Sequence, residues 1–445
     1  MGGFESIFKI PELWRRIVFT LGMLIVYRVG IYVPTPGIDA HKLSQMFKGT
    51  SETLYGLINM FTGGALETFS IFALGIAPYI SVSIIMQILS HTIPALENLS
   101  KEGEQGRRVI TRYTRIGTIA LAIAHGLAIS FGLENQGVVA QPGWAFRFMT
   151  VVTLSAGTAF IMWLGEQITE RGIGNGISLI IFAGIVARMP IVLVGTFERV
   201  ETGILSYPTM LLVLLFGVGV VAFIVFVERC QRRIPIQYPK RAMGRRMTQA
   251  TTQHLPLKLN STGVIPPIFA SMFLVFLAML AKFSRNEWVQ NKAELLAGGT
   301  LLHDVLFAAL IIFFAFFYMS MMWDPDKIAD NLKRNGGFIP TVRPGKDTAE
   351  FISRVLVRLT VWGALYVCAV CIIPQRFYHE TGTGEYAYIF GGTAILIVVG
   401  VILDTVSQME AHIVARNYEG FMSKSPGKVR FSTRGAPARG RLIQR

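Results

Sequence analysis

The chain has 445 residues, a net charge of +15 and an apolar content of 52%, but only 16% of its residues are charged. Soluble globular chains carry about 25% charged residues, so this shortfall indicates that much of the surface faces lipid instead of water. The chain has only three cysteines, which excludes a disulfide-rich secreted scaffold. The composition therefore predicts a single membrane domain.

Ten apolar runs, separated by proline, glycine and charged residues, predict membrane-spanning helices. A helix needs about 20 residues to cross a hydrocarbon core of roughly 30 Å. In chain order, the predicted spans cover residues 17–33, 71–93, 116–133, 148–163, 177–194, 209–227, 264–281, 305–323, 355–373 and 388–403. The predicted fold class is an all-α polytopic membrane protein. Five spans in each half would give the halves opposite orientations, as in folds whose pathway runs between inverted repeats.

The connections between these spans carry basic residues very unevenly. Of the 42 lysines and arginines, 31 fall in the two ends and one alternate set of connections, and 8 fall in the other set. Basic residues are retained on the cytosolic side, so both termini are predicted to be cytosolic. Two connections on that side cover residues 228–259, which are strongly basic, and residues 324–354, whose charges are more mixed. The first is longer than topology requires, and loops of that length are usually functional. Its charge fits either anionic lipid or a macromolecular partner.

Residues 54–93 do not form one continuous helical pattern. The first part is short and polar, and Gly63 and Gly64 interrupt any helical run. The second part, from residue 71, can span the membrane although Pro78 removes a backbone hydrogen bond. Irregular backbone at membrane depth is tolerated only where it is buried in protein or lines a wet cavity. The pattern predicts either a short re-entrant, plug-like piece or an ordinary external loop with a surface helix.

The sequence holds no motif for catalysis or cofactor binding. It has no phosphate-binding loop and no H-E-x-x-H metal motif, and the glycine-rich stretch at residues 172–176 is predicted to be a tight turn. Cys368 and Cys371 form a C-x-x-C inside an apolar run, which we interpret as two small buried residues and not as a redox pair. We therefore expect no enzyme activity, no cofactor and no metal.

Charged residues are few within the predicted spans. Glu166 and Asp404 lie towards cytosolic ends, and Arg28 lies near the opposite end of its span, where snorkelling to the interface is expected. Arg188 and Arg358 lie within or at the edges of other spans. Ion-coupled transport usually depends on intramembrane acids, which are scarce here. An ion-coupled secondary transporter is the alternative to an apolar passage that is driven by an outside motor.

Several longer motifs go beyond these general patterns. They are SIFALGIAPYI at residues 70–80, KEGEQGRR at 101–108, WLGEQITERGIGNGIS at 163–178 and ADNLK at 329–333, together with RPG at 343–345, RLT at 358–360 and GGT at 391–393. These motifs closely resemble the SecY family, the channel-forming subunits of the bacterial Sec protein translocase, and the resemblance covers residues 11–418. The chain departs from relatives in two places. Pro266 and Pro267 double a proline that relatives often have singly, and Thr341 stands where relatives often have glycine.

The resemblance implies a SecY-like clam-shell of two inverted five-helix halves, residues 1–200 and 201–410, and a basic cytosolic tail at 411–445. The implied pore ring consists of Ile76, Ile80, Ile181, Ile268 and Ile397. The implied plug covers about residues 59–70 and includes Asn59, Phe61, Gly63, Gly64 and Leu66. The implied lateral gate includes Ser81, Pro266 and Pro267. The cytosolic arginines expected to meet a partner are Arg241, Arg245, Arg246 and Arg343.

The function implied by the resemblance is that of the central protein-conducting channel of the general secretory pathway, in a bacterial inner membrane. Such a channel passes unfolded preproteins across the membrane and releases hydrophobic segments, including signal sequences, sideways into lipid. The implied partners are SecE and SecG in a heterotrimer, the SecA ATPase or the ribosome as the driving machine, and anionic lipids.

Overall fold

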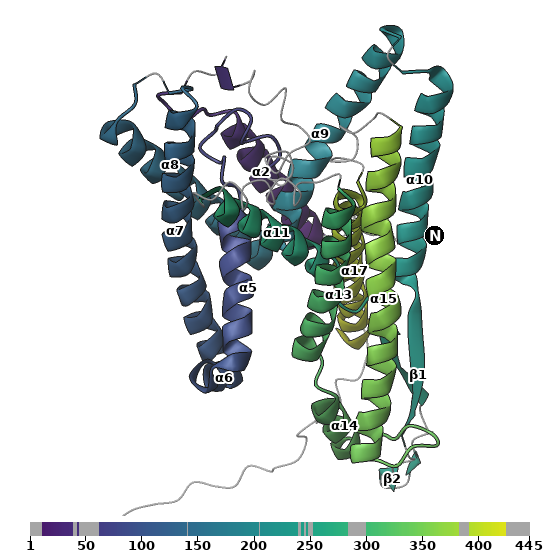
Figure 1. Cartoon of the computed structure of the whole chain (residues 1–445). Coiled ribbons are helices and arrows are strands. Elements are labelled where there is room, and N and C mark those ends of the chain that lie inside the picture. Colours follow the sequence, from purple (N-terminus) through teal and green to yellow (C-terminus); the bar gives the residue numbers. More distant parts are fainter. Residues whose placement is uncertain are drawn as a thin grey trace, which may run out of the picture.

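The computed structural model describes residues 11–38, 42–43, 62–139, 141–203, 205–238, 242–243, 246–247, 252–283, 300–381 and 391–423. Its helices (Figure 1) are α2 (Pro11–Ile31), α5 (Ala77–Thr92), α6 (Pro94–Lys101), α7 (Glu104–Asn135), α8 (Trp144–Arg171), α9 (Gly176–Glu201), α10 (Tyr207–Arg229), α11 (Ile265–Phe283), α13 (Leu301–Met322), α14 (Pro325–Arg334), α15 (Lys346–Glu380) and α17 (Gly392–Ser423). Between α10 and α11, β1 (Gln231–Gln237) pairs with β4 (Thr252–Lys258), and β2 (Ala242–Met243) pairs with β3 (Arg246–Met247).

Within the described residues, seven helices are long and apolar enough to cross a membrane, and the bent pair of α5 and α6 would make an eighth span. The predicted class of helical membrane protein is confirmed, whereas the number of ten spans stays a prediction. α2 is not among the seven, and it carries Arg15, Arg16 and Arg28. α11 is also not among the seven, because its described apolar part, Ile265–Leu274, is too short to cross a membrane by itself.

The second predicted span begins later than expected. α5 starts at Ala77, and residues 71–76 form turns. Pro78 therefore lies in the first helical turn, where backbone N–H groups have no partner within the helix, so the predicted loss of a hydrogen bond does not occur. α5 ends at Thr92, and α6 starts at Pro94 at an angle of 97° to it.

Most other predicted spans lie inside longer helices. α7, α8, α9, α10 and α15 each contain the predicted apolar run and extend beyond it, because polar residues continue the helix past the apolar part. α13 begins slightly before the predicted start at residue 305. The predicted start of the last span, residue 388, lies outside the described residues.

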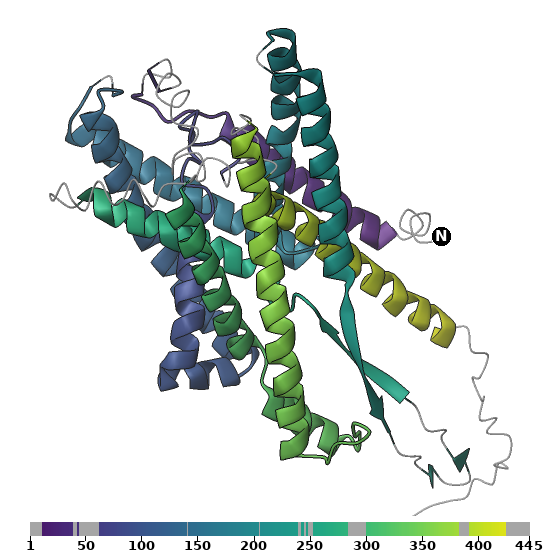
Figure 2. The same ribbon diagram turned by 45° about the vertical axis from the view of Figure 1, so that its right-hand side comes forward.

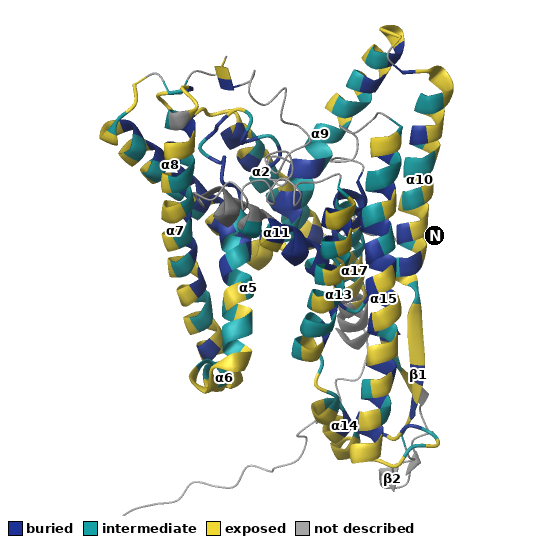
Figure 3. Cartoon of the chain, viewed as in Figure 1, coloured by how far each residue is buried: buried dark blue, intermediate teal, exposed yellow. Residues whose placement is uncertain are grey.

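Two groups of helices stand side by side (Figure 1). In the first group α7 contacts α5 and α8, and in the second α15 contacts α10, α13 and α17. α2 contacts α8 and α9, α9 contacts α8, α10 and α17, and α11 contacts α5 and α13. α9 and α11 therefore link the two groups. Buried residues gather in the interior where the two groups meet, while much of the outer surface of α7 and α10 is exposed (Figure 3).

The connection between α10 and α11 contains an unpredicted β-hairpin (Figure 2). In it Ile234 of β1 lies opposite Leu255 of β4. Ile234 and Leu257 are buried in a cluster with residues of α13 and α15. Apolar residues alternate with other residues in both strands, and this signal was available in the sequence. The hairpin lies at the same end of the molecule as α6 and α14, and the connection between α9 and α10 lies at the other end (Figure 1).

Candidate functional site

Five isoleucines that were expected to line a pore lie together in one buried cluster. Ile76 caps the start of α5 and Ile80 follows one turn later, while Ile181 lies on α9, Ile268 on α11 and Ile397 on α17. Their exposed fractions are 3%, 9%, 3%, 8% and 1% in that order. All five belong to one cluster of contacting buried side chains. We call these five residues the isoleucine cluster.

The chemistry of the isoleucine cluster is that of hydrocarbon. Its side chains have no hydrogen-bonding atoms. An ion that enters the cluster would lose its hydration water and find no polar group to replace it, which costs free energy. Ile76 and Ile80 are four residues apart and therefore share one helix face, and the other three come from helices distant in the sequence. A constriction lined in this way can exclude ions by dewetting.

Residues 62–76, which we call the inner segment, lead into α5 without forming a helix. Gly63 and Gly64 have φ angles of 67° and 93°, which glycine adopts without steric cost. Phe69 has a φ of 43° and is only 2% exposed, so the backbone is strained at a buried position. Residues 62–76 are therefore largely buried, irregular backbone, whereas residues 54–61, to which the two alternatives also apply, lie outside the described residues.

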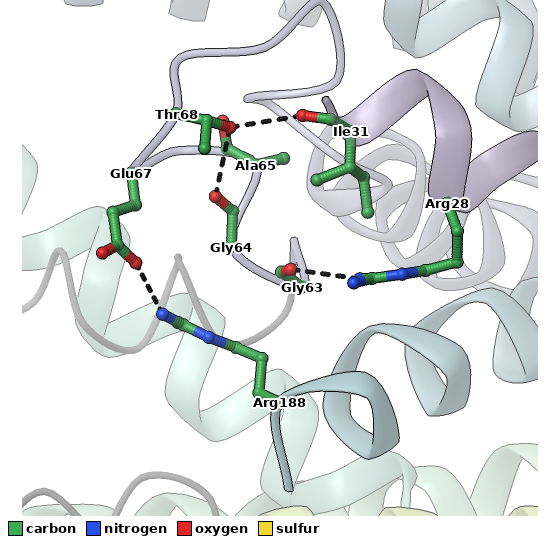
Figure 4. Close-up of polar contacts among 8 residues, drawn as sticks. All are labelled: Arg28, Ile31, Gly63, Gly64, Ala65, Glu67, Thr68 and Arg188. Atoms are coloured by element: carbon green, nitrogen blue, oxygen red, sulfur yellow. Dashed lines mark hydrogen bonds and ion pairs between the residues drawn. The ribbon is translucent and has the colours of Figure 1, made fainter. Parts of the chain in front are cut away.

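The inner segment is hydrogen-bonded to α2 and to the residues that follow α2 in the chain (Figure 4). The Tyr27 hydroxyl donates to the Thr62 carbonyl at 3.2 Å. Arg28 Nη1 donates to the Gly63 carbonyl at 3.3 Å, and the Thr68 hydroxyl donates to the Ile31 carbonyl at 3.2 Å (Figure 4). The backbone N–H of Thr35 donates to the Phe69 carbonyl, and that of Ile71 to the Val33 carbonyl. Arg28 is thus bonded to the inner segment, and its expected snorkelling stays a prediction.

α8 and α9 approach the inner segment closely at glycines. A Cβ added at Gly157 of α8 would lie 1.9 Å from the carbonyl oxygen of Ile71. A Cβ added at Gly63 would lie 2.7 Å from the Cα of Gly184 on α9. Neither distance can be accommodated without a shift of the backbone, because both neighbouring atoms belong to the main chain. Glycine at these positions therefore determines how near the inner segment lies to α8 and α9.

We expect the substitution Gly157→Ala to destabilise the folded protein by about 1–3 kcal/mol, the usual cost of overpacking a filled site. The purified protein should unfold at a lower temperature and lose protease resistance earlier. Gly132→Ala on α7 is the matched control, because no atom lies within 4 Å of its added Cβ. Equal unfolding midpoints for the two variants would contradict the close packing at Gly157.

The structure describes three of the five predicted plug residues. Asn59 and Phe61 lie outside the described residues. Gly63 and Gly64 are in the inner segment beside α9 and its Arg188. Leu66 is 5% exposed, but it packs in a separate buried cluster that includes Leu154 of α8. The side chain of Leu66 therefore does not belong to the isoleucine cluster.

The three predicted lateral-gate residues lie on two helices that contact each other, with Ser81 on α5 and both prolines on α11. Pro266 and Pro267 are buried in the first turn of α11, which begins at Ile265. The first N–H groups of a helix have no partner within it, so the doubled proline removes no hydrogen bond from α11. The helix continues without interruption to Phe283.

The predicted docking arginines are described only in part. Arg241 and Arg245 lie outside the described residues, and for Arg246 only its place in β3 is described. Arg343 is exposed in the connection between α14 and α15, and its carbonyl accepts a hydrogen bond of 2.7 Å from the Thr348 hydroxyl. Thr341 has a φ of 76°, which is unfavourable for a β-branched residue. The departure from glycine at this position therefore strains the turn that carries Arg343.

Ion pairs that join separate segments were not predicted, and two of them involve charged residues within or beside the predicted spans or in the inner segment. Arg188 Nη2 lies 2.6 Å from Glu67 Oε2 and joins α9 to the inner segment (Figure 4). Arg115 Nη2 lies 2.7 Å from Glu166 Oε2 and joins α7 to α8. The sequence contained one indication of the first pair. Arg188 follows Ile181 by seven residues and therefore lies on the same face of α9 as this expected pore residue.

Nothing in the described part of the chain has the arrangement of a metal or redox centre. No group of three or more His, Cys, Asp or Glu residues there is placed to hold a metal ion. Cys368 and Cys371 are buried in α15 as free thiols. The turn at residues 172–176 connects α8 to α9, and Asn175 caps α9 by accepting from the N–H groups of Ile177 and Ser178.

Comparisons with known proteins agree with one another. A sequence model of the SecY family matches residues 70–406. The protein translocase subunit SecY of Pseudomonas aeruginosa is 48% identical over 420 residues, which cover 94% of this chain and 94% of that protein. The same subunit of Escherichia coli K12 is 48% identical, and the match covers 94% of this chain and 95% of that protein. That of Thermus thermophilus is 44% identical, and the match covers 96% of this chain and 98% of that protein.

Solved structures share the fold at lower sequence identity. The structure of a protein conducting channel superposes with a TM-score of 0.66 at 16% identity, covering 92% of this chain and 94% of that chain. Sec61 in the canine ribosome–channel complex gives a TM-score of 0.62 at 16% identity, with the same coverage of both chains. Identities at this level show a common fold.

Proposed function

The chain belongs to the SecY family, and we propose that it forms the protein-conducting channel of a bacterial Sec translocase. It is a multi-pass membrane protein. In this proposal unfolded preproteins cross between two halves, residues 1–200 and 201–410, and hydrophobic segments leave sideways into lipid. The protein has no catalytic activity of its own, and a partner supplies the energy.

The observation that carries the proposal is the isoleucine cluster. Ile76, Ile80, Ile181, Ile268 and Ile397 come from four helices that are distant in the sequence, and they form one buried hydrocarbon surface. A ring of such side chains closes against water at rest and offers a passing polypeptide no hydrogen bond that would trap it. The inner segment packs beside this cluster, since Ala65 and Phe72 lie in the same group of contacting buried side chains as the five isoleucines. We assign residues 59–70 as the plug on this basis.

We assign the lateral gate to the contact between α5 and α11. Ser81 lies on α5, and Pro266 and Pro267 lie in the first turn of α11. The two helices also carry Ile80 and Ile268, so separating them would open the isoleucine cluster towards lipid. This arrangement supports a sideways exit for hydrophobic segments.

The proposed cytosolic face is the end that carries α6, α14 and the β-hairpin. Both termini, including the basic tail at residues 411–445, would lie on that side of the bacterial inner membrane. Arg241, Arg245, Arg246 and Arg343 would dock the SecA ATPase or the ribosome, whose RNA phosphates these cations can neutralise. SecE and SecG would complete the heterotrimer, and anionic lipids would surround the basic connections.

The transporter alternative has little support in the described part of the chain. Glu166 is paired with Arg115 at 2.7 Å, and Asp404 lies 3.9 Å from Lys258. Ion-coupled transport needs acidic side chains within the membrane that can exchange protons or bind cations. Glu166 instead forms an ion pair with Arg115. Membership of the SecY family is a separate argument for the channel.

Reconstitution tests the proposed function. The purified full-length chain and its co-purifying partners are placed in lipid vesicles with SecA, ATP and an unfolded preprotein. We expect the preprotein to become resistant to added protease only in vesicles that contain the chain and ATP. Absence of protection would overturn the proposal, and so would uptake of a small solute driven by an ion gradient in place of protein transport.

A further inference from the structure

We propose that the ion pair between Glu67 and Arg188 is a latch that holds the inner segment in its resting position and sets how readily the channel opens. The proposal rests on the channel function proposed above and concerns the regulation of that same site. Arg188 Nη2 donates to Glu67 Oε2 at 2.6 Å (Figure 4). A hydrogen bond between two charged groups is stronger than one between neutral groups.

The position of Arg188 on α9 links the latch to the isoleucine cluster. Ile181, Gly184 and Arg188 follow at intervals of three and four residues, so they lie on one face of the helix. Gly184 contacts the inner segment at Gly63, one turn before Arg188. Arg188 is about 10 Å further along the helix axis than Ile181, in the direction of the connection to α10. The latch therefore lies between the isoleucine cluster and the proposed external side.

The inner segment depends on its neighbours to stay in place. Along residues 62–76 its own backbone hydrogen bonds are isolated turn bonds, such as that from the Gly75 N–H to the Phe72 carbonyl, and Phe69 stores backbone strain at a φ of 43°. Its bonds to α2 each involve a backbone carbonyl as acceptor. Of the contacts described here, the pair with Arg188 is the one between opposite full charges, and it joins the segment to α9 one turn beyond the close approach of Gly63 to Gly184.

The partial exposure of the pair makes the latch reversible. The side chain of Arg188 is 26% exposed and that of Glu67 is 44% exposed. A fully buried pair would resist separation, because each charge would be left without water or partner. A fully exposed pair would contribute almost nothing. At intermediate exposure both charges can be rehydrated when a translocating chain displaces the inner segment.

Charge reversal tests the latch. The variants Glu67→Arg and Arg188→Glu, and the double variant that carries both, are purified as full chains with their co-purifying partners, and resting ion conductance is measured in planar bilayers. Each single variant should raise the resting conductance by about three- to tenfold, and the double variant should return it to within about twofold of the wild type. Restoration by the double variant would trace the effect of the single variants to the pair itself.

A second ion pair provides a matched control. Arg147 Nη2 lies 2.6 Å from Glu134 Oε2 between α7 and α8, so its geometry is similar but it does not touch the inner segment. Arg188→Gln should raise the resting conductance, and Arg147→Gln should not. The latch is overturned if the single reversals conduct like the wild type, or if the double variant conducts like the singles. Failure of wild-type vesicles to protect a preprotein would instead overturn the channel function.

Discussion

The substitutions Ile80→Glu and Ile181→Glu are each expected to raise the resting ion conductance of the purified protein by about tenfold or more. Ile80 and Ile181 are 9% and 3% exposed, so a carboxylate at either position has no water and no cation among the isoleucines. Burying an unpaired charge costs several kcal/mol, and admitting water to the cluster relieves that cost. Stabilising the hydrated state of the cluster by about 1.4 kcal/mol relative to the dry state is enough to raise its population tenfold.

Two controls separate a wet pore from a damaged fold. Ile181→Val keeps the hydrocarbon surface and should leave the resting conductance near that of the wild type, with a stability loss of about 0.5–1.5 kcal/mol. Leu154→Glu buries the same charge on α8 in a different cluster, where the wild-type side chain is fully buried. It should lower the yield of folded protein without raising conductance. Unchanged conductance of Ile80→Glu and Ile181→Glu in planar bilayers would remove both residues from the constriction.

The helices were predictable where an apolar run is long and has polar ends. α10 and α15 illustrate this, because each contains its predicted span. The ends were less predictable, since α15 begins at Lys346, well before the predicted start of the apolar run at residue 355. The hairpin of β1 and β4 was missed because only Ile234, Ile236, Leu255 and Leu257 show its alternation, amid many charges.

The geometry of the site depends on contacts between residues far apart in the chain. Gly63 and Gly64 predicted that no helix forms there, but nothing local shows that the segment is buried. Its burial depends on Gly157 and Gly184, whose lack of side chains admits the backbone of the segment. Ile76 and Ile80 share a face by spacing alone, whereas Ile397 joins them only through the packing of α17 on α9. The family resemblance supplied that long-range information.

The substitution Arg343→Glu is expected to reduce SecA-dependent protein transport by at least about tenfold while the protein stays folded and inserted. Within the described residues the exposed Arg343 side chain makes no hydrogen bond or ion pair, so reversing its charge breaks nothing inside the protein. Close charge pairs between proteins are coupled by about 1.5–7 kcal/mol, so a reversed charge at such a contact abolishes productive docking. Transport into vesicles and the unfolding midpoint are measured on the same preparation.

The turn that carries Arg343 explains why the position of this cation matters as well as its charge. The Thr348 hydroxyl holds the Arg343 carbonyl at 2.7 Å, and Thr341 keeps a φ of 76° at a cost of about 1–3 kcal/mol. This hydrogen bond and the strained turn fix the backbone from which the exposed Arg343 side chain extends. Arg354→Glu, an equal charge change at an exposed arginine of α15, should therefore have a much smaller effect. Equal losses of transport in the two variants would indicate that net charge, and not a contact at Arg343, is what the motor requires.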